Sequence, residues 1–218
     1  QARIITILRQ SGSLSIAEMA TIAGVSAETI RRDAHQLAEN GEVEKLHGAL
    51  ALPHNMGETS YERRMREFAP AKIAIARAAS QLVRDGDSLI IDTGTTTTFF
   101  ARELRQRRNL TVITNSTEVA RTLGDVGDNT VLLAGGKLQS DSGGTYGPTA
   151  VDFIARFRVK HAFLSITALD IMAGPMNAAL EEAEFAAMAV TCATHRVILA
   201  DSSKFGATSF ARVCGYSD

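Results

Sequence analysis

Five short runs rich in β-branched and apolar residues recur beyond residue 80, and segments with helical character separate them. The runs are Ser88 to Asp92, Thr111 to Asn115, Thr130 to Ala134, His161 to Thr167 and Arg196 to Ala200. Residues Phe99 to Arg107 are typical of one intervening helix. Apolar strands that alternate with helices pack as a parallel sheet with both faces covered. This part of the chain is therefore predicted to form an α/β domain.

The N-terminal part of the chain has a helical periodicity instead. Apolar residues follow that spacing at Ile4, Ile7 and Leu8, at Ile16, Met19, Ala20 and Ala23, and at Ile30, Ala34 and Leu37. Ser15 and Ser26 precede the second and third segments, where a hydroxyl can cap a helix. Gly24 and Gly41 follow the same segments, where glycine adopts the conformation that ends a helix. Three short helices are predicted.

The third helix has an outward face that can contact DNA. Because Ile30 and Leu37 turn inward, the other positions of its first turns face solvent. The N-terminal residues of the second helix in a helix-turn-helix reach base edges and phosphates. We predict DNA contacts from Ser26, Ala27, Glu28, Thr29, Arg31 and Arg32. The alternative is a solvated amphipathic helix whose arginines pair with Asp33 or Glu28.

A small hairpin is expected next, with strands at Val43 to His47 and Leu50 to Leu52 around Gly48. It would form a wing whose tip, His47 and Gly48, touches the flanking DNA backbone. The formal net charge of -1 does not favour DNA binding, because nucleic-acid-binding proteins usually present a basic patch. The prediction therefore depends on the helices and not on the overall charge.

We place a winged helix-turn-helix domain at residues 1–53, a linker at 54–71 and the α/β domain at 72–218. Pro53 to Gly57 is the expected hinge. A basic segment follows it, close to the start of a helix around Lys72, with arginines at Arg63, Arg64 and Arg66. These arginines either help to hold DNA or belong to a solvated linker helix.

The loop from Asp92 to Thr97 is the strongest candidate for a ligand site. Ligands of parallel sheets bind at the carboxyl ends of the strands, where loops lead into helices. Gly94 lets the backbone approach an anion, Thr95 and Thr96 add hydroxyl groups, and the helix N-terminus attracts negative charge. The loop has neither the Walker pattern nor GxGxxG, so a nucleotide is not implied. The alternative is that the threonines merely cap a helix.

Other strand ends add polar groups to this candidate effector site. The further predicted residues are Thr114, Asn115, Gly135, Gly136, Lys137, Gly147, Glu182 and Lys204. Lys204 would neutralise a phosphate, while Asp92 and Glu182 would hold hydroxyl groups. Each has a simpler explanation as a turn, a cap or a surface charge, but together they predict a polar phosphorylated ligand.

Two sets of motifs resemble one family. Thr29 to Asp33 and His47-Gly48 are similar to the winged helix-turn-helix of DeoR-type bacterial transcriptional regulators, over residues 3–50. The sensor domain of that family has motifs similar to four segments of this chain, namely Asp92 to Thr96, Ile113 to Asn115, Ala134 to Gly136 and Ala200 to Phe205. The resemblance implies a sensor fold similar to phosphosugar isomerases, and within the family it is strongest to glycerol-phosphate-type repressors.

The resemblance implies a repressor of a carbohydrate or polyol catabolic operon. Its partners would be double-stranded operator DNA, a phosphorylated sugar or polyol effector, and further copies of the chain in a homodimer or homotetramer. The competing hypothesis is an enzyme, a sugar-phosphate isomerase or transferase in which Asp92, Glu182 and Lys204 act as base, acid and electrophile. A third is an interaction module that does not bind DNA. We expect the regulator.

Composition excludes several other classes. The chain of 218 residues is 45% hydrophobic and 22% charged, which suits a globular protein with a substantial core. It has no run of about 18 apolar residues, so no membrane span is expected. Cys192 and Cys214 form neither a CxxC pair nor a zinc-type cluster, so no metal or cofactor is predicted. We expect a cytoplasmic protein, and we expect that Gln1 and Asp218 are trimmed ends.

Overall fold

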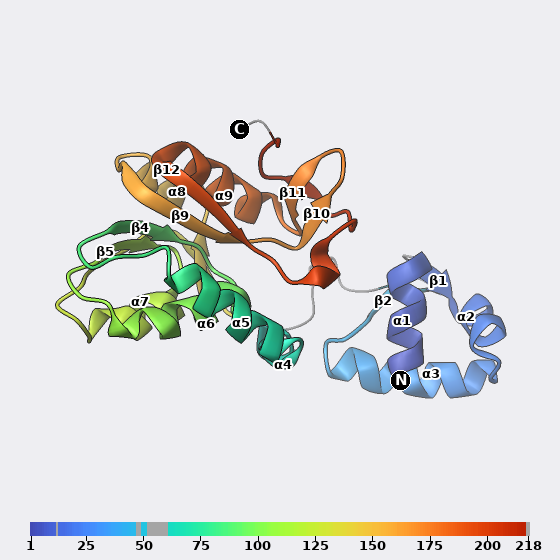
Figure 1. Ribbon diagram of the computed structural model, residues 1–218. Coiled ribbons are helices and arrows are strands. Elements are labelled where there is room, and N and C mark those ends of the chain that lie inside the picture. The colour runs from blue at the N-terminus through green and yellow to red at the C-terminus, as the bar shows by residue number, and fades with distance from the viewer. Residues whose placement is uncertain (12, 47–48, 52–60, 217–218) are drawn as a thin grey trace. The chain divides into compact units, whose positions relative to one another are not determined.

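The computed structural model describes residues 1–11, 13–46, 49–51 and 61–216. The chain divides into two compact units, Gln1–Thr59 and Ser60–Asp218, which Figure 1 shows in blue and in green to red. The wing residues His47 and Gly48, which we predicted to contact DNA, lie outside the described residues.

The first unit contains the three predicted helices and a small sheet. The helices are α1 (Ala2–Ser11), α2 (Ile16–Ala23) and α3 (Ala27–Glu39). Strands β2 (Glu44–Leu46) and β3 (Ala49–Ala51) form the predicted antiparallel hairpin. Strand β1 (Ser13–Ser15), which we did not predict, pairs with β3 on its other side. Together they give the winged helix-turn-helix arrangement.

Side-chain caps fix the limits of α2 and α3. The Ser15 hydroxyl accepts a hydrogen bond from the Glu18 amide at 3.2 Å, and the Glu18 carboxylate accepts one from the Ser15 amide at 2.8 Å. This capping box satisfies two amides that the helix itself leaves unpaired. Gly24 ends α2 in the left-handed conformation, with a φ of 68°. The Ser26 hydroxyl then accepts from the Thr29 amide at 3.1 Å and starts α3.

A single apolar cluster holds the first unit together. Its buried members are Ile4, Ile7, Leu8, Met19, Ala20, Ala23, Ile30, Ala34, Leu37, Val43 and Leu50. They include all the predicted helix positions except Ile16, which is partly buried. Because these residues occupy the inner face of α3, its opposite face is exposed.

The second unit is built on a five-stranded parallel sheet in the order β12-β9-β4-β5-β6. Its strands are β4 (Ser88–Ile91), β5 (Thr111–Thr114), β6 (Thr130–Leu133), β9 (Val159–Ser165) and β12 (Ala193–Leu199). All five predicted strands are present, and no other strand in the described part of the chain joins this sheet. This strand order places β4, whose end carries the predicted ligand loop, at the centre of the sheet.

Helices cover both faces of this sheet (Figure 1). One face carries α5 (Ala69–Ser80), α6 (Thr95–Glu103) and α7 (Thr117–Gly124), and the other carries α8 (Pro148–Ile154) and α9 (Leu180–Cys192). A short 3-10 turn, η1 (Leu104–Gln106), extends α6. A separate apolar cluster fills each interface, with Phe100 of α6 against Phe163 of β9 at a ring distance of 4.2 Å on the first face.

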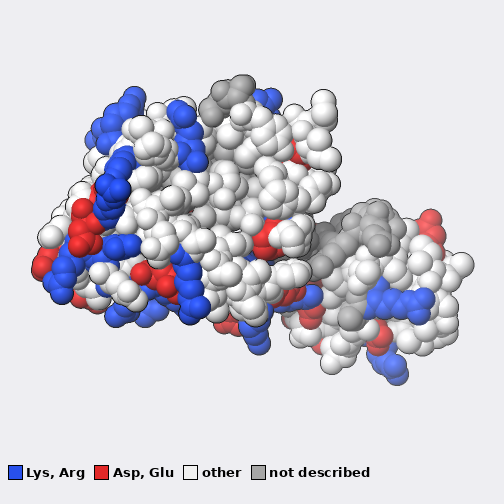
Figure 2. Space-filling model, viewed as in Figure 1, with Lys and Arg blue, Asp and Glu red and all other residues white. Residues whose placement is uncertain are grey.

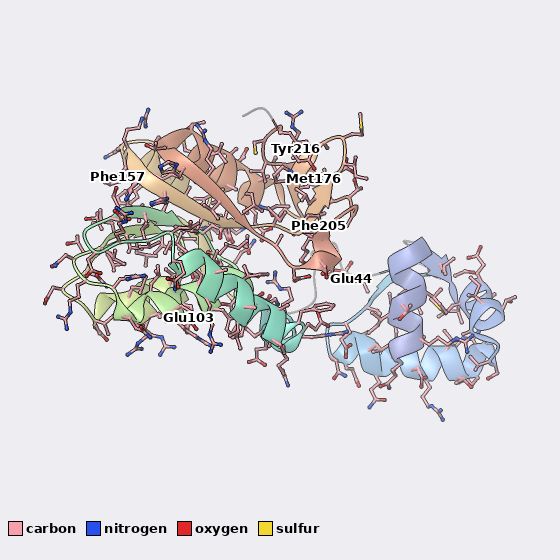
Figure 3. All side chains as sticks on the ribbon, in the orientation of Figure 1. Glu44, Glu103, Phe157, Met176, Phe205 and Tyr216 are labelled. Atoms are coloured by element: carbon pink, nitrogen blue, oxygen red, sulfur yellow. The ribbon has the colours of Figure 1, made fainter. Side chains whose placement is uncertain are left out.

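Several short elements frame the carboxyl edge of the sheet, and we did not predict the strands among them. They are helix α4 (Tyr61–Arg66), strands β7 (Lys137–Gln139) and β8 (Gly144–Tyr146), the small sheet of β10 (Ala168–Asp170), β11 (Gly174–Asn177) and β13 (Ala211–Arg212), and the 3-10 turn η2 (Ser202–Lys204). Figure 3 labels Met176 of β11, with Phe205 and Tyr216 nearby. Among the described residues, no helix has the length and apolar character that crossing a membrane requires.

Candidate functional site

The outer face of α3 presents most of the side chains that we predicted to contact DNA. Glu28, Arg31 and Arg32 are exposed, while Ala27 and Thr29 are half-buried. Ser26 is exposed, but its hydroxyl is also engaged in the cap of α3, where it lies 2.9 Å from the Thr29 hydroxyl. The charged side chains of the first turns are therefore available to a partner, and the cap holds the helix that presents them.

The two arginines of α3 form the ion pairs that the alternative prediction named. The Arg31 Nη1 lies 3.1 Å from the Glu28 Oε2, and the Arg32 Nε lies 3.9 Å from the Asp33 Oδ1. The arginine side chains are nevertheless 63% and 80% exposed. Ion pairs this exposed contribute only about 0–1 kcal/mol. A phosphate or a base edge can therefore replace the intramolecular partner at little cost.

Charge on the first unit is mixed. On the face that Figure 2 shows, Lys and Arg side chains lie beside Asp and Glu side chains. This agrees with the net charge of -1 for the whole chain. DNA binding by this unit would rely on a few positioned arginines more than on a broad basic surface.

The arginines of the linker segment lie in α4, within the second unit. Arg63 pairs with Glu67 at 2.8 Å and Arg66 with Glu62 at 3.7 Å, both one helical turn apart. Arg64 reaches Asp141 at 4.0 Å. The pairs of Arg63 and Arg66 correspond to the solvated-helix alternative, whereas the Arg64 side chain is only 16% exposed.

Asp92 is the central group of the candidate effector site, which we call the cradle. It directly follows β4 and is only 5% exposed. Both of its carboxylate oxygens accept a hydrogen bond from the Ser165 amide, at 3.0 and 2.9 Å, at the end of the neighbouring strand β9. Burial raises the pKa of Asp92 well above its usual value, and the hydrogen bond from Ser165 opposes that shift only in part. The carboxyl group is thus held rigidly between two strand ends.

Glycine is required at position 94 because the backbone there lies close to Ser165, and not because of its backbone angles. Its φ of -175° is ordinary extended backbone. A β-carbon at Gly94, however, would lie 1.9 Å from the Ser165 Oγ and 2.6 Å from the Ser165 Cβ. A side chain at this position would therefore collide with β9. Its absence allows the chain to turn directly from β4 into α6.

The threonines after Gly94 are all buried and divide into two kinds. Thr97 donates to the carbonyls of Asp92 and Gly94, at 3.0 Å in both cases, and so fixes the loop. Thr95 and Thr96, at the first turn of α6, are 7% and 6% exposed. They stand beside the first amides of the helix, which have no partner within it and attract anions. This is the geometry expected of a phosphate cradle.

Thr114 and Asn115 form the frame of the cradle. The Thr114 hydroxyl accepts from the Ser116 amide at 3.0 Å. Asn115 accepts from the Thr93 hydroxyl at 3.1 Å and donates to the Thr145 carbonyl at 3.1 Å. Both residues are fully buried. Their side chains connect the ends of β4, β5 and β8, so they hold the loop after β4 in place.

The predicted glycines are spread along the rim. Gly135, Gly136 and Lys137 are exposed, and Gly136 has a φ of 143°, with the Tyr146 carbonyl only 2.4 Å from the position of a β-carbon. Gly147 is the N-cap of α8, with a φ of 95°. These residues let β7, β8 and α8 turn tightly around the cradle, and Lys137 adds a cation at its outer edge.

A second acidic group faces the cradle from the other side of the sheet. Glu182 lies in the first turn of α9 and is half-buried. Its charge raises the pKa of Asp92, and it raises the pKa of Tyr146, for which burial is the largest cause. The structure therefore brings Asp92, Glu182 and Tyr146 close to one another, as acceptors and donors for hydroxyl groups.

Lys204 belongs to a separate cluster at the end of β12, with Lys72 and Asp201. Lys72 is only 4% exposed, and its ammonium donates to the Arg64 carbonyl. Burial lowers the pKa of Lys72, the Asp201 carboxylate raises it, and the Lys204 charge lowers it. One Asp201 oxygen accepts from the Ser203 amide at 2.9 Å, whereas the other is buried without a hydrogen bond from any described residue.

Sequence analysis missed four contributors, namely Ser165, Thr145, Tyr146 and Lys72. Ser165 ends β9, so the strand-end rule could have identified it. Thr145 and Tyr146 lie on the short strand β8, and no pattern in the sequence indicated that strand. Lys72 lies in the first turns of α5, and only the fold shows that this helix begins at the carboxyl edge of the sheet.

A capped helix-turn-helix unit joined to an α/β unit with a polar cradle defines a DNA-binding transcriptional regulator with a sensor domain. The chain belongs to the DeoR family: residues 1–56 match the DeoR-like helix-turn-helix domain and residues 67–218 match the DeoR C terminal sensor domain. We refer to the two units below as the DNA-binding unit and the sensor unit.

Curated relatives include repressors of this family. The glycerol-3-phosphate regulon repressor of Escherichia coli (strain K12) is 34% identical over 203 residues, which cover 93% of this chain and 81% of that protein. The HTH-type transcriptional repressor CsqR of the same strain is 30% identical over 211 residues, with coverages of 97% and 81%. Among solved structures, ribose 5-phosphate isomerase A from Methanocaldococcus jannaschii matches with a TM-score of 0.46 and 19% identity, over 63% of this chain and 54% of that one.

Proposed function

We propose that this protein represses a carbohydrate or polyol catabolic operon and that a phosphorylated sugar or polyol bound in the sensor unit controls its binding to the operator. The observation that carries the proposal is the cradle, where Gly94, Thr95 and Thr96 start α6 beside the buried Asp92. The names of the relatives support the operon class, since one is a glycerol-3-phosphate regulon repressor and another a putative aga operon transcriptional repressor.

The effector would use both kinds of group in the cradle. A phosphate suits the first amides of α6, together with the cations at the rim. Hydroxyl groups suit the carboxylates, which accept hydrogen bonds. We propose contacts from Asp92, Gly94, Thr95, Thr96, Glu182 and Lys204 within a frame formed by Thr114, Asn115, Gly135, Gly136, Lys137 and Gly147. No cofactor is needed for this role.

Operator recognition would use the exposed face of α3 and the wing. We propose contacts from Ser26, Ala27, Glu28, Thr29, Arg31, Arg32, His47 and Gly48. Two copies would present their recognition helices to half-sites about 34 Å apart if one helical turn of DNA separates them. A homodimer or homotetramer would supply those copies. Because the proposed operator is genomic DNA, we expect the protein to act in the cytoplasm.

We propose a regulator and not an enzyme. In the competing mechanism Asp92 is the general base, which needs an oxygen within reach of the substrate proton. Both Asp92 oxygens accept from the Ser165 amide. This supports a binding and framing role. Turnover of a phosphosugar by the purified protein would reverse the assignment.

Binding to DNA can be tested before the operator sequence is identified. A duplex selected in vitro by the full-length protein would provide the target for a binding titration at several salt concentrations. Groove binding predicts that log K falls with log salt, with a slope of about 0.9 per contacted phosphate. A flat salt profile would exclude the proposed interface.

Effector binding is tested by thermal shift over a panel of phosphorylated sugars and polyols that includes glycerol 3-phosphate. A true effector stabilises the protein in proportion to the logarithm of its concentration over Kd. The double variant Thr95→Ala with Thr96→Ala should still bind the selected duplex but lose the thermal shift and the ligand response. The control carries Thr130→Ala with Thr191→Ala, two exposed threonines outside the cradle. Equal ligand affinity in both variants would remove the loop from the site.

A further inference from the structure

Helix α4 is the first described element after residues 52–60, which connect it along the chain to the DNA-binding unit. It has 6 residues, and none of them is buried. A helix this short is not stable by itself in water. Its position therefore depends on the contacts that the rest of the sensor unit makes with it.

The N-terminal end of α4 is tied to two parts of the cradle. The Tyr61 hydroxyl lies 2.6 Å from the Thr98 hydroxyl, and Thr98 closes the threonine run that opens α6. The Tyr61 amide donates to both carboxylate oxygens of Asp141, at 2.9 and 3.2 Å. Asp141 lies between β7 and β8, and β8 carries Tyr146 of the cradle. A displacement of Thr98 or of Asp141 would therefore also displace Tyr61, the first residue of α4.

The other end of α4 is tied to the lysine cluster. The Lys72 ammonium donates to the Arg64 carbonyl, toward the C-terminal end of the helix. The same ammonium interacts with the charges of Asp201 and Lys204 at the end of β12. Lys72 therefore links the backbone of α4 to the lysine cluster at the end of β12.

Apolar packing adds little to these polar contacts. A pocket of about 360 Å³ lies between α4 and α6, and its lining includes Met65 and Arg102. This pocket leaves part of the interface between α4 and α6 unfilled. The hydrogen bonds at its two ends then determine where it sits.

We propose that α4 is a latch that transmits occupancy of the cradle to the segment leading to the DNA-binding unit. The inference rests on the proposed effector site. An anion at the start of α6 orders the turn that contains Thr98, the partner of Tyr61. Occupancy therefore stabilises α4 in its position, and by reciprocity a loosened α4 loosens the start of α6.

The reciprocal effect can be measured without any ligand, by hydrogen exchange on the full-length protein. Tyr61→Phe removes the hydroxyl contact with Thr98. Amide exchange should accelerate roughly three- to tenfold, the range that one lost hydrogen bond gives, both in α4 and in the first turn of α6. Asp141→Asn, a change at an exposed carboxylate, should accelerate exchange in α4 as well. Acceleration confined to α4 would overturn the latch.

The control is Tyr216→Phe, which removes the hydrogen bond from an exposed tyrosine to the Asp170 carbonyl, 2.7 Å long. Tyr216 lies on the opposite side of the sensor unit from α4 (Figures 1 and 3). Exchange in α4 and α6 should be unchanged in this variant. Equal acceleration in both variants would show general loosening of the unit and would also overturn the latch.

A second arm adds glycerol 3-phosphate or inorganic phosphate to the wild type and follows the amides of residues 94–96 as a measure of occupancy. Protection there together with slower exchange in α4 supports the latch. Protection there with unchanged α4 overturns the latch and leaves the proposed function standing. If neither compound protects residues 94–96, the result counts against the phosphate cradle, and the ligand-free comparison alone decides whether α4 and α6 are coupled.

Discussion

The DNA-binding unit and the sensor unit place their functional groups in opposite environments. On α3 the charged groups stand in solvent, with Arg31 more than half exposed above a core that it does not touch. In the cradle Asp92, Thr95 and Thr96 are buried at the junction of several strands. The charged surface of α3 lies on a single helix. The cradle, in contrast, forms only where segments that are distant in the sequence come together.

This difference has an energetic consequence. An exposed arginine with an exchangeable partner contributes about 0–1 kcal/mol to stability, so recognition can change while the fold is kept. A buried polar group that loses its partner costs about 1–3 kcal/mol. Operator specificity in this architecture can therefore change by single surface substitutions, while effector specificity is constrained by the stability of the sensor unit.

The largest expected effect tests whether the DNA-binding unit depends on its own core. Leu37 of α3 is 1% exposed within that core. Leu37→Ala should destabilise the unit by about 2–5 kcal/mol through lost burial and the cavity left behind. Thermal unfolding should then show an early transition, while hydrogen exchange in the sheet of the sensor unit stays at the wild-type level. Leu82→Ala, at an exposed leucine, is the control. Simultaneous unfolding of both units would mean that they are not separate in stability.

The next effect should appear in the cradle. Gly94→Ala places a β-carbon against Ser165, and rotation of the Ser165 side chain moves its Oγ but not its Cβ. We expect a loss of roughly 1–3 kcal/mol from overpacking, measured by urea unfolding. Ligand binding should be lost with it. The matched control is Gly124→Ala at the end of α7, where a β-carbon has nothing within 4 Å. Normal stability in Gly94→Ala would show that the loop can move away from β9.

The same contrast explains what could be predicted from the sequence. The helices of the DNA-binding unit were predicted with their caps, because Ser15, Gly24 and Ser26 act on residues within one turn. The five sheet strands were predicted because they are short apolar runs separated by helical segments; β4, β5 and β9 are largely buried, whereas the edge strands β6 and β12 are more exposed. These signals are local, so a single chain reveals them.

The remaining strands depend on partners far along the chain. β1 has three residues and exists because β3 lies beside it, and β8 carries buried polar residues such as Thr145 that show no strand pattern. The sequence indicated which strand ends carry polar groups. It could not show that Asn115 would bind Thr93 and Thr145, since those contacts require the folded sheet.

An effect on binding alone is expected at α3. Arg31→Ala should weaken binding of the selected duplex by about 1–3 kcal/mol if a bidentate contact is lost, and should leave the unfolding free energy within about 0.5 kcal/mol. Arg121→Ala is a matched control, because Arg121 forms an exposed ion pair with Glu118 at the same spacing, 3.0 Å long, on the sensor unit. Equal losses of DNA affinity in the two variants would point to general electrostatics and not to a contact of α3.

The smallest expected effect is the change in the free energy of unfolding with pH that the buried Asp92 causes. The pKa of Asp92 is raised by burial, so the folded state binds its proton more tightly than the unfolded state does. The free energy of unfolding should therefore fall as the pH rises from about 3.8 through the folded pKa of Asp92. Asp92→Asn removes that decline, because its amide can still accept from Ser165 but does not ionise. Its stability relative to the wild type should increase with pH, as urea unfolding across the acidic to neutral range would measure.

Asp87, directly before β4, should give the opposite dependence of stability on pH. Burial raises its pKa, but hydrogen bonds from the Lys160 ammonium and the Arg84 amide outweigh burial, and the net shift is downward. Its ionised form therefore stabilises the fold above the usual value of 3.8, and that contribution is lost as the pH falls through the folded pKa. Asp87→Asn should be less stable than the wild type at neutral pH, and the difference should shrink in acid. If both variants gave the same pH dependence, the Asp92 carboxyl group of the cradle would not differ electrostatically from an ordinary paired carboxylate such as Asp87.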